Sequence, residues 1–529
     1  GMLFVIHSVF LRKTVFMPRN LPLTVIKYEL LSAPEGIKLE IRPLAAHRGA
    51  DRLCPDKNGS DFESFFTENS VTLRGRGHQS HFSFNQGEWF PKPLWFEKLL
   101  YEHDDCEKPG TDSLWSPGFL SIDMNEGETV YVLLGAENGH YGHGSVAAME
   151  KETRLLLQEN LLANSLLKKT PMVKELLHSA SHCLSQMDGK RPAIFSGYPS
   201  VKETARETFI SIPGLLLVTG KTDFAEGVLK VWLERAVSND HVMPSEVNPH
   251  TGSLVTRACD AGLWFFYALD KLCDQTGRTD LIVENWAQLT ALIGRYIGGI
   301  PAIGIDLDKD GLLDLRSDDP GSNWMDGDID GRPIVERKGK LVEVNALWYN
   351  ALRAMEKYSE ILGLGKESEE YGSWAERSRK SFQSTFWCDK GYLYDWVEGR
   401  NKDESVRCNQ ILAVSLPASV IDPERGRSIV ETCWNELYTT FGLRTLDPHH
   451  EKYKGRCEGR IDQREKARFM GMAWPWLLGQ FITAYLRYNP DRKDIGWCFL
   501  RPFLSHLRKG CLGGVAEIFD GSMPYKPHG

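Results

Sequence analysis

The period of the hydrophobic pattern changes near residue 145, and this change constrains the fold more than any other feature of the chain. Before it, runs in which apolar and polar residues alternate are separated by Gly, Pro, Asn and Asp; examples are 23–31, 36–44, 70–77 and 128–136. Such alternation predicts antiparallel strands that bury one face. From Val146 onward, apolar residues recur every three to four positions, which predicts helices.

We therefore predict a β-sandwich over residues 2–145 and a mainly α domain over 146–529, with a flexible boundary at 139–144. A chain of 529 residues is too long for one ordinary core, which agrees with two domains. About a dozen helical segments suggest six antiparallel pairs that close into a six-fold α/α barrel. A superhelical repeat array is the other option, but no fixed sequence period supports it. The expected helices include 148–169, 206–219, 222–237, 258–276, 280–297, 341–363, 405–418 and 468–488.

Charge and cysteine usage exclude several classes of function. The net charge of −8 gives no basic surface for nucleic acid or for an anionic membrane. No run approaches the roughly 20 apolar residues of a membrane span, and the apolar segment 2–11 fits a strand as well as a signal sequence. The 11 cysteines contain no CxxC pair, which argues for reduced thiols in the cytoplasm and against a zinc site. The sequence does not indicate an oligomeric state.

Two acidic residues on the expected loops are candidates for acid–base chemistry. Asp326 follows Trp324 and Met325 directly, and an aromatic wall beside a carboxyl group suits sugar binding and can keep the acid protonated. Glu517 follows a glycine-rich turn 191 residues later. In a barrel, loops of one rim lie together, so the two acids could face each other across a pocket. An ordinary loop for Asp326 and a solvated terminal acid for Glu517 are the alternatives.

Two further motifs have a functional and a structural interpretation. Arg206 and Glu207 open a helix, where they either hold sugar hydroxyls or complement the helix dipole. DLDKDGLLDLRS, residues 306–317, is similar to a calcium loop but has Ser317 in place of the final bidentate Glu. A surface turn is therefore the favoured interpretation of that segment, and we predict no metal site.

A family resemblance rests on stretches that occur in one order over nearly the whole chain: LEIRPLAAHR (39–48), GYPSVKETARETFISIPGLLL (197–217), DAGLWFFYAL (260–269), NWMD (323–326), VEVNALWYNAL (342–352), FGLRTLDP (441–448), WPWLLGQF (474–481) and AEIFDG (516–521). Together they resemble the amylo-α-1,6-glucosidase family, the glucosidase portion of glycogen debranching enzymes within the glucoamylase-like clan. The resemblance implies an inverting glycosidase on a six-fold α/α barrel, preceded by a sandwich that is shortened here.

The resemblance also implies roles for individual residues and requires no cofactor. The general acid of the family falls on Asp326 and the general base on Glu517. The pair that holds the terminal glucose corresponds to Arg206 and Glu207. Further residues expected to line the same pocket are Asp260, Trp264, Trp324, Arg407, Asn409, Gln410 and Trp474.

The chain departs from the family pattern in the residues around the expected site. The aromatic run before the Arg-Asp pair of the family is replaced by 200–205, and the pair itself reads Arg206-Glu207. The tyrosine, histidine and glutamine that precede the WPW motif have become Arg468, Phe469 and Met470. We expect hydrolysis of an α-1,6-glucosyl branch stub or a related small α-glucoside. The alternatives are a carbohydrate-binding relative with little turnover, or a hydrolase of another disaccharide or glycosylated solute.

Overall fold

The computed structural model describes residues 1–18, 21–49, 53–54, 61–100, 111–136, 145–187, 191–196, 202–249, 251–509 and 513–528, except for residues 163–170 and the side chains of 156–162, 171 and 187. Its internal contacts divide the chain into two compact units, Gly1–Leu162 and Ala163–Gly529. The predicted boundary segment 139–144 and residues 200–201 lie outside the described residues.

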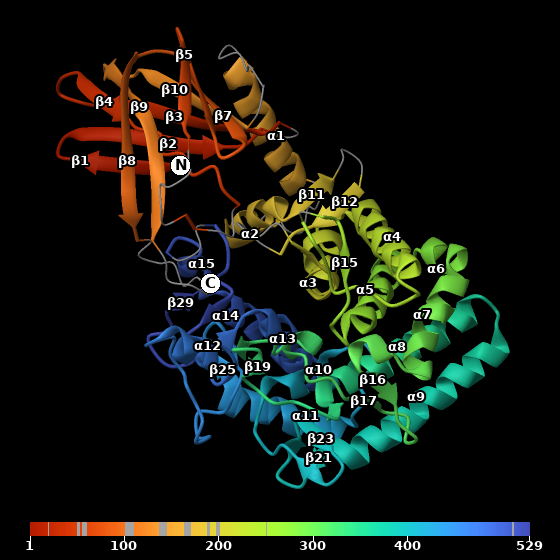
Figure 1. Ribbon diagram of the computed structural model, residues 1–529. Coiled ribbons are helices and arrows are strands. Elements are labelled where there is room, and N and C mark those ends of the chain that lie inside the picture. Colours follow the sequence, from red (N-terminus) through yellow and green to blue (C-terminus); the bar gives the residue numbers. More distant parts are fainter. Residues whose placement is uncertain are drawn as a thin grey trace. The chain divides into compact units, whose positions relative to one another are not determined.

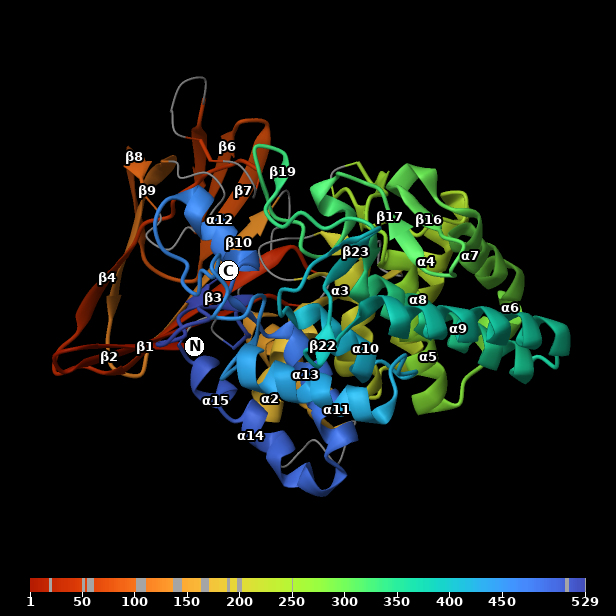
Figure 2. The same ribbon diagram turned by 90° about the horizontal axis from the view of Figure 1, so that it is seen from below.

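The first unit is built from two antiparallel sheets (Figures 1 and 2). The larger has the order β1-β2-β3-β10-β7-β6-β5 and the smaller the order β4-β9-β8. Helix α1, Val146–Leu162, follows the last strand. The strands are β1 Met2–Ile6, β2 Val9–Phe16, β3 Leu23–Ser32, β4 Ile37–Ile41, β5 Glu63–Thr67, β6 Ser70–Gly75, β7 His78–Phe84, β8 Glu88–Leu99, β9 Asp112–Met124 and β10 Thr129–Ala136.

Side chains from both sheets share one core. Tyr28 and Phe84 from the larger sheet and Trp115 and Ile122 from the smaller belong to the same buried cluster. Alternate residues of a strand point to one face, and this is why alternating sequences such as 23–31 become β3. The predicted strand pattern of 2–11 is wrong in one respect, because the chain turns at His7, with φ of 54°, between β1 and β2.

The second unit is mainly helical and contains short strands in the segments between helices. Its core is a single cluster that extends from Met172 to Phe519. The helices are α2 Pro171–His182, α3 Ala205–Ile212, α4 Thr222–Ser238, α5 Ala261–Thr276, α6 Asp280–Glu284, α7 Trp286–Gly298, α8 Val342–Ile361, α9 Gly365–Phe386, α10 Leu412–Ser415, α11 Pro423–Thr432, α12 Ile461–Phe469, α13 Trp476–Tyr488, α14 Gly496–Leu500 and α15 Phe503–His506.

Five of these helices follow one another in space as they do in sequence. Helix α3 contacts α5, α5 contacts α8, α8 contacts α10 and α10 contacts α13, while α9 lies along α8 (Figures 1 and 2). The row curves back on itself, since Trp264 of α5 meets Trp476 of α13 at a ring-centroid distance of 6.3 Å. A mainly helical domain behind a strand-rich region is therefore confirmed. Closure into six pairs stays a prediction.

Short strands fix several segments between the helices. One three-stranded sheet consists of the strands β13 Glu203–Thr204, β14 Glu246–Val247 and β15 Leu254–Val255. A five-stranded sheet has the order β25-β26-β27-β28-β29 and brings residues near the C-terminus beside residues 438–474. Its strands are β25 Tyr438–Thr439, β26 Gly442–Arg444, β27 Ala473–Trp474, β28 Ile518–Phe519 and β29 Pro527–His528. The remaining strands of the unit are β11 Leu184–Met187, β12 Arg191–Ile194, β16 Ile305–Leu307, β17 Leu313–Leu315, β18 Asp328–Ile329, β19 Arg332–Pro333, β20 Lys340–Leu341, β21 Trp387–Cys388, β22 Tyr392–Leu393, β23 Trp396–Glu398 and β24 Asn401–Lys402.

Three expected helices differ from the observed ones. The segment 280–297 is interrupted at Asn285 and forms α6 and α7. The predicted helix 468–488 begins only at Trp476, as α13. Before it, Phe469 ends α12. Gly471, with φ of 145°, and strand β27 separate the two helices. The segment 405–418 is helical only from Cys408 to Ser415, first as a 3-10 turn and then as α10. Periodicity does not predict helix α12, because its sequence, IDQREKARF, has no apolar stripe.

Candidate active site

Asp326 emerges at the surface from a buried backbone. Trp324 and Met325 before it are 6% and 0% exposed, whereas the side chain of Asp326 reaches solvent. Gly327, the next residue, lies against the ring of Phe469. The contact is so close that a Cβ atom added at position 327 would lie only 2.4 Å from that ring. The two neighbours therefore hold the backbone on both sides and fix where the carboxyl group emerges.

The surroundings of Asp326 favour its protonated form. Although the side chain reaches solvent, nearby protein atoms displace much of its water, and this desolvation raises its pKa above the usual range. The positive charge of Arg206 opposes the rise, the negative charge of Glu207 adds to it, and the charge of Arg468 also opposes it. These interactions place four charged groups in one neighbourhood, and the net result is a carboxyl group with a raised pKa.

Arg206 is held by a carboxylate from a neighbouring helix. Its Nε and Nη2 donate to the two oxygens of Asp260 at 2.8 and 2.9 Å, and Asp260 also accepts a hydrogen bond from Trp264 Nε1 at 3.2 Å. Asp260 is 2% exposed and immediately precedes α5. The paired guanidinium is thus oriented by the protein, while the side chain of Glu207, the next residue in α3, is exposed.

Glu517 immediately precedes β28 and pairs with a residue of α12. Its Oε2 accepts from Nη2 of Arg468 at 3.1 Å, and its side chain is 51% exposed. The backbone on both sides is closely packed: Ala473 of β27 pairs with Phe519 of β28, and a Cβ on Gly521 would overlap the carbonyl oxygen of Gly471. Arg468 thus contacts Glu517 directly, and its charge also acts on Asp326.

Aromatic rings form a wall behind these charged groups. The ring of Trp324 lies edge-on to Trp474 at a centroid distance of 5.5 Å and to Trp476 at 5.2 Å, and Phe469 stacks on Trp474. Trp324 and Trp474 are less than 10% exposed. Both rings therefore support the site through protein contacts and offer little open face to a ligand.

The other predicted pocket residues are buried and bonded to protein. Asn409 accepts from Trp324 Nε1 at 2.7 Å and donates to Asp395 at 2.7 Å. Arg407 donates to the carbonyl oxygens of Thr445 and Phe469, and Gln410 donates to the carbonyl of Arg407. Their exposed fractions are 4% or less. The structure gathers these residues beneath the site, where they hold its backbone.

A buried ion cluster that no sequence motif predicts completes this support. Arg337 is fully buried and donates to Glu343 at 2.6 Å, to Asp395 at 2.7 Å and to Asn323 at 3.1 Å. Because Asp395 also binds Asn409, the cluster connects the segment that carries Trp324 to the segment 407–410. A buried pair of this kind is costly to break.

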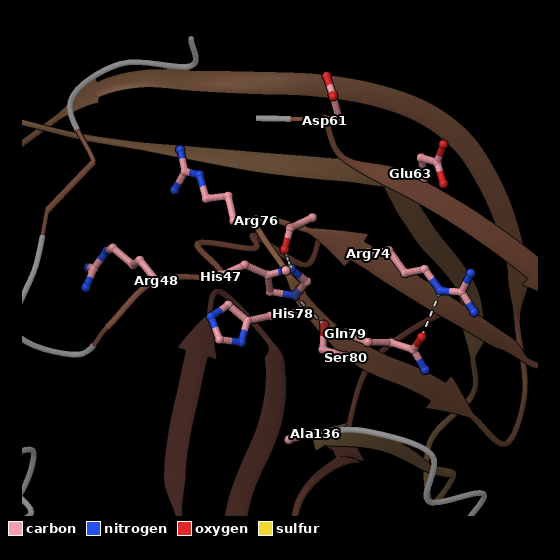
Figure 3. A pocket seen from close by; sticks show the side chains of 12 residues that line it. His47, Arg48, Asp61, Glu63, Arg74, Arg76, His78, Gln79, Ser80 and Ala136 are labelled. Carbon is pink, nitrogen blue, oxygen red and sulfur yellow. Dashed lines mark hydrogen bonds between the residues drawn. The ribbon is translucent and has the colours of Figure 1, made fainter. Parts of the chain in front are cut away.

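Two other groups of polar residues in the described parts of the chain do not include any of the candidate site residues: one lines a pocket and the other could bind a metal ion. A pocket of about 820 Å³ in the first unit is lined by charged side chains of both signs, including Arg74 and Glu63 (Figure 3). The ring nitrogens of His47 hydrogen-bond with the carbonyl oxygen of Gly75 at 3.2 Å and the hydroxyl of Ser80 at 2.8 Å. In the second unit, Glu436, Asp447 and His449 lie close enough to share a metal ion, at a partly exposed loop. The calcium-like segment instead binds Lys340, whose Nζ donates to Asp308 at 2.8 Å.

The sequence comparisons identify the family. The sequence model of amylo-alpha-1,6-glucosidase matches residues 177–529, two thirds of the chain and all of the candidate site residues. The chain belongs to the amylo-alpha-1,6-glucosidase family. A second model, of the N-terminal region of glycogen debranching enzymes, matches residues 2–131. The family resemblance of the short motifs is thereby confirmed, and the chain is a glycoside hydrolase by family.

A solved structure shares the fold of this amylo-alpha-1,6-glucosidase family member. A bacterial glucoamylase, determined in complex with acarbose, superposes with a TM-score of 0.57 at 12% sequence identity, and the match covers 90% of this chain and 75% of that one. No curated protein sequence gives a significant match. Among the described residues, no helix is long and apolar enough to cross a membrane.

Proposed function

We propose that the protein is an inverting α-glycoside hydrolase in which Asp326 is the general acid and Glu517 the general base. The observation that carries the proposal is the different environment of the two carboxyl groups. Desolvation raises the pKa of Asp326, which favours a proton donor. Glu517 is half exposed, which leaves it open to a solvent water, and its Oε2 accepts a hydrogen bond from Arg468 at 3.1 Å. One acid and one base are what a single displacement requires.

The proposed reaction is one displacement at the anomeric carbon. Asp326 donates its proton to the glycosidic oxygen as the bond to the leaving group breaks, while Glu517 removes a proton from the attacking water. The water attacks from the face opposite the leaving group, and the configuration of the sugar inverts. In this proposal, exposed Glu207 accepts hydrogen bonds from sugar hydroxyls, and the Arg206–Asp260 pair supports this by holding the start of the same helix.

The proposed substrate is an α-1,6-linked glucosyl branch stub or a related small α-glucoside. The family match supports the linkage, and the acarbose complex of the similar glucoamylase supports an oligosaccharide ligand. The buried position of Trp324 and Trp474 limits stacking on a sugar ring, so we expect hydrogen bonds from charged groups to provide most of the recognition.

Glucose release from isomaltose, panose and phosphorylase-limit dextrin tests this function. Asp326→Asn and Glu517→Gln should each lower kcat by about 10²- to 10⁴-fold, since each removes one proton-transfer group. Glu458→Gln, which removes an exposed carboxylate paired with Arg456, is the matched control and should retain activity. Proton NMR at early times should show β-glucose as the first product. Unchanged turnover in both variants, or α-glucose as the first product, would reject the assignment.

A second function is favoured by the ion pair between Glu517 and Arg468. A base that is already bound by a guanidinium has one oxygen less for the attacking water, which would suit a carbohydrate-binding relative with little turnover. Calorimetric binding of isomaltose or panose without release of glucose would support this alternative. Release of glucose from another disaccharide or a glycosylated solute alone would instead support a hydrolase of different specificity.

A further inference from the structure

We propose that Asp520 is a positioning residue for Glu517: its buried carboxylate ties the segment that carries the proposed base to a loop that packs on the end of α12. The inference rests on the base role proposed for Glu517 above and adds the residue that keeps this base in place. Asp520 follows Glu517 by three residues and has no other part in the proposed reaction.

The carboxylate of Asp520 faces protein groups. The residue is 2% exposed, and its Oδ1 accepts hydrogen bonds from the backbone N–H of Cys457 at 3.0 Å and from Nε2 of His528 at 2.9 Å. Burial disfavours the ionised form, but the bonds from His528 and Cys457 outweigh it and lower the pKa of Asp520 below its usual range. Because bonds to an ionised carboxylate are stronger than those between neutral groups, Asp520 joins the segments that carry Cys457 and His528 firmly.

The bond to His528 closes the hairpin that begins directly after Glu517. Strand β28 follows Glu517 and pairs antiparallel with β29, which ends at His528. The backbone N–H of Asp520 also donates to the carbonyl oxygen of Lys526 at 2.9 Å. Asp520 therefore holds the hairpin through its backbone and through its side chain.

The bond to Cys457 joins this hairpin to the loop 453–457. Ser522, two residues after Asp520, contacts the same loop. Its backbone N–H donates to the carbonyl oxygen of Gly455 at 3.0 Å, and its hydroxyl lies 3.1 Å from the hydroxyl of Tyr453. The hairpin and the loop are thus packed together, and Asp520 provides the charged contact between them.

The loop leads in turn to the proposed acid. The backbone N–H of Lys454 donates to the carbonyl oxygen of Met470 at 2.6 Å, directly after α12. Phe469, the last residue of α12, lies against Gly327, which adjoins Asp326. A continuous series of contacts therefore connects the hairpin with the backbone of Asp326. Loss of the bond between hairpin and loop should change where the base lies relative to the acid.

Other contacts should keep the segment folded when the carboxylate is removed. His506 accepts from the backbone N–H of Ala516, and β28 also pairs with β27. Glu517 lies between these two anchors, so we expect it to be displaced in Asp520→Ala while its segment stays attached. A displaced base lowers kcat. KM should change little, because Asp520 is buried and does not line the sugar site.

Two substrates reveal which catalytic group Asp520 supports. Isomaltose requires a proton donor and a base, whereas α-glucosyl fluoride releases fluoride without a donated proton and still needs the base to activate water. Asp520→Ala should lower kcat by about 10- to 100-fold on both substrates. Asp326→Asn should lose activity on isomaltose and retain most of it on the fluoride. Lys526→Ala, which removes an exposed side chain from the same hairpin, is the matched control and should keep wild-type values on both.

Conservative variants show whether the hydrogen bonds themselves are responsible. Asp520→Asn keeps an oxygen acceptor of the same size, and His528→Gln keeps a donor, so each should have a kcat between those of Asp520→Ala and wild type. These two variants replace Asp520→Ala should it fail to fold. Wild-type kcat in all variants that fold, or a loss on isomaltose alone, would overturn the inference.

Amide hydrogen exchange separates the inference from the proposed function, since it requires no turnover. In Asp520→Ala, the peptides that contain Cys457 and Glu517 should both exchange faster than in wild type, and in Lys526→Ala neither should change. Unchanged exchange at Glu517 would overturn the positioning role and leave the base assignment intact. Wild-type turnover in Glu517→Gln would reject the base assignment, even if the two peptides responded together.

Discussion

At the scale of single residues, the candidate site depends on close packing beside its charged groups. Gly327 is the clearest example, because Phe469 occupies the space that any side chain would need. Phe469 is 2% exposed and contacts Trp324 and Trp474, so its ring cannot move aside at low cost. A larger residue at position 327 must therefore move the backbone that carries Asp326.

This packing predicts that Gly327→Ala lowers kcat more than it lowers stability. A displacement of the general acid by a fraction of an ångström should reduce kcat by about 10- to 100-fold. Gly365→Ala, on a helix with open space around the glycine, is the matched control and should retain full activity. Shortening the obstructing ring in Gly327→Ala/Phe469→Leu should recover part of the loss. Wild-type kcat in Gly327→Ala would show that the position of Asp326 does not depend on this contact.

At the scale of elements, Glu517 is positioned by a histidine from the short helix α15. His506 Nε2 accepts a hydrogen bond from the backbone N–H of Ala516 at 3.0 Å. Its ring lies among Phe441, Phe503 and Phe519, with the nearest centroid, that of Phe519, at 4.7 Å. Burial among these rings lowers the pKa of His506 below its usual value of about 6.5. The neutral imidazole is thus the form that holds the segment bearing Glu517.

Protonation of His506 should therefore weaken the fold in acid. Since its pKa is lower in the folded state, the unfolded chain binds the proton more tightly, and stability falls as pH decreases through and below about 6.5. Unfolding free energies from urea denaturation at pH 5 and pH 7.5 should show a smaller difference in His506→Gln than in wild type, because glutamine accepts the same bond without titrating. His506→Ala should lose about 1–3 kcal/mol at pH 7.5. An equal pH dependence in wild type and His506→Gln would contradict this role.

The same scale shows which parts of the structure the sequence could predict. Periodicity located β3, β10, α4 and α8, because each buries one face and therefore repeats apolar residues at its own period. Helix α12 was missed since its stability depends on contacts of single residues such as Phe469 and not on an apolar stripe. The Arg337 cluster was missed because its partners, Glu343 and Asp395, lie in other elements, and no local pattern encodes such a pairing.

The site itself was predictable in part. The acids Asp326 and Glu517 were found from local context and family motifs, but their placement relative to Arg468 depends on the fold. Buried Asn409 and Gln410 were expected to meet substrate, and the structure shows that both hydrogen-bond to protein groups instead. Their roles in substrate contact stay predictions. Polar residues in a motif can be retained by a family to support a site as well as to line it.

At the scale of the whole molecule, the chain consists of two units that each have a hydrophobic core. The first unit, Gly1–Leu162, buries Phe84 between its sheets, and the second, Ala163–Gly529, buries Phe265 among its helices. Both side chains are 0% exposed. Helix α1 belongs to the first unit by its contacts, so the compact unit extends to Leu162, beyond the predicted limit of 145. Separate cores imply separate cooperative unfolding.

Calorimetry should accordingly show two transitions that respond to different substitutions. Phe84→Ala removes a large buried side chain and should destabilise the first unit by about 3–5 kcal/mol. The midpoint temperature of the transition of the first unit should fall, and that of the second unit should stay unchanged. Phe265→Ala, the matched substitution in the second unit, should lower the other transition and reduce glucose release at temperatures above it. The proposed acid and base both lie in the second unit. The Phe84→Ala variant should therefore retain activity up to the temperature at which the second unit unfolds. A single transition that moves with both variants would show that the two cores unfold together.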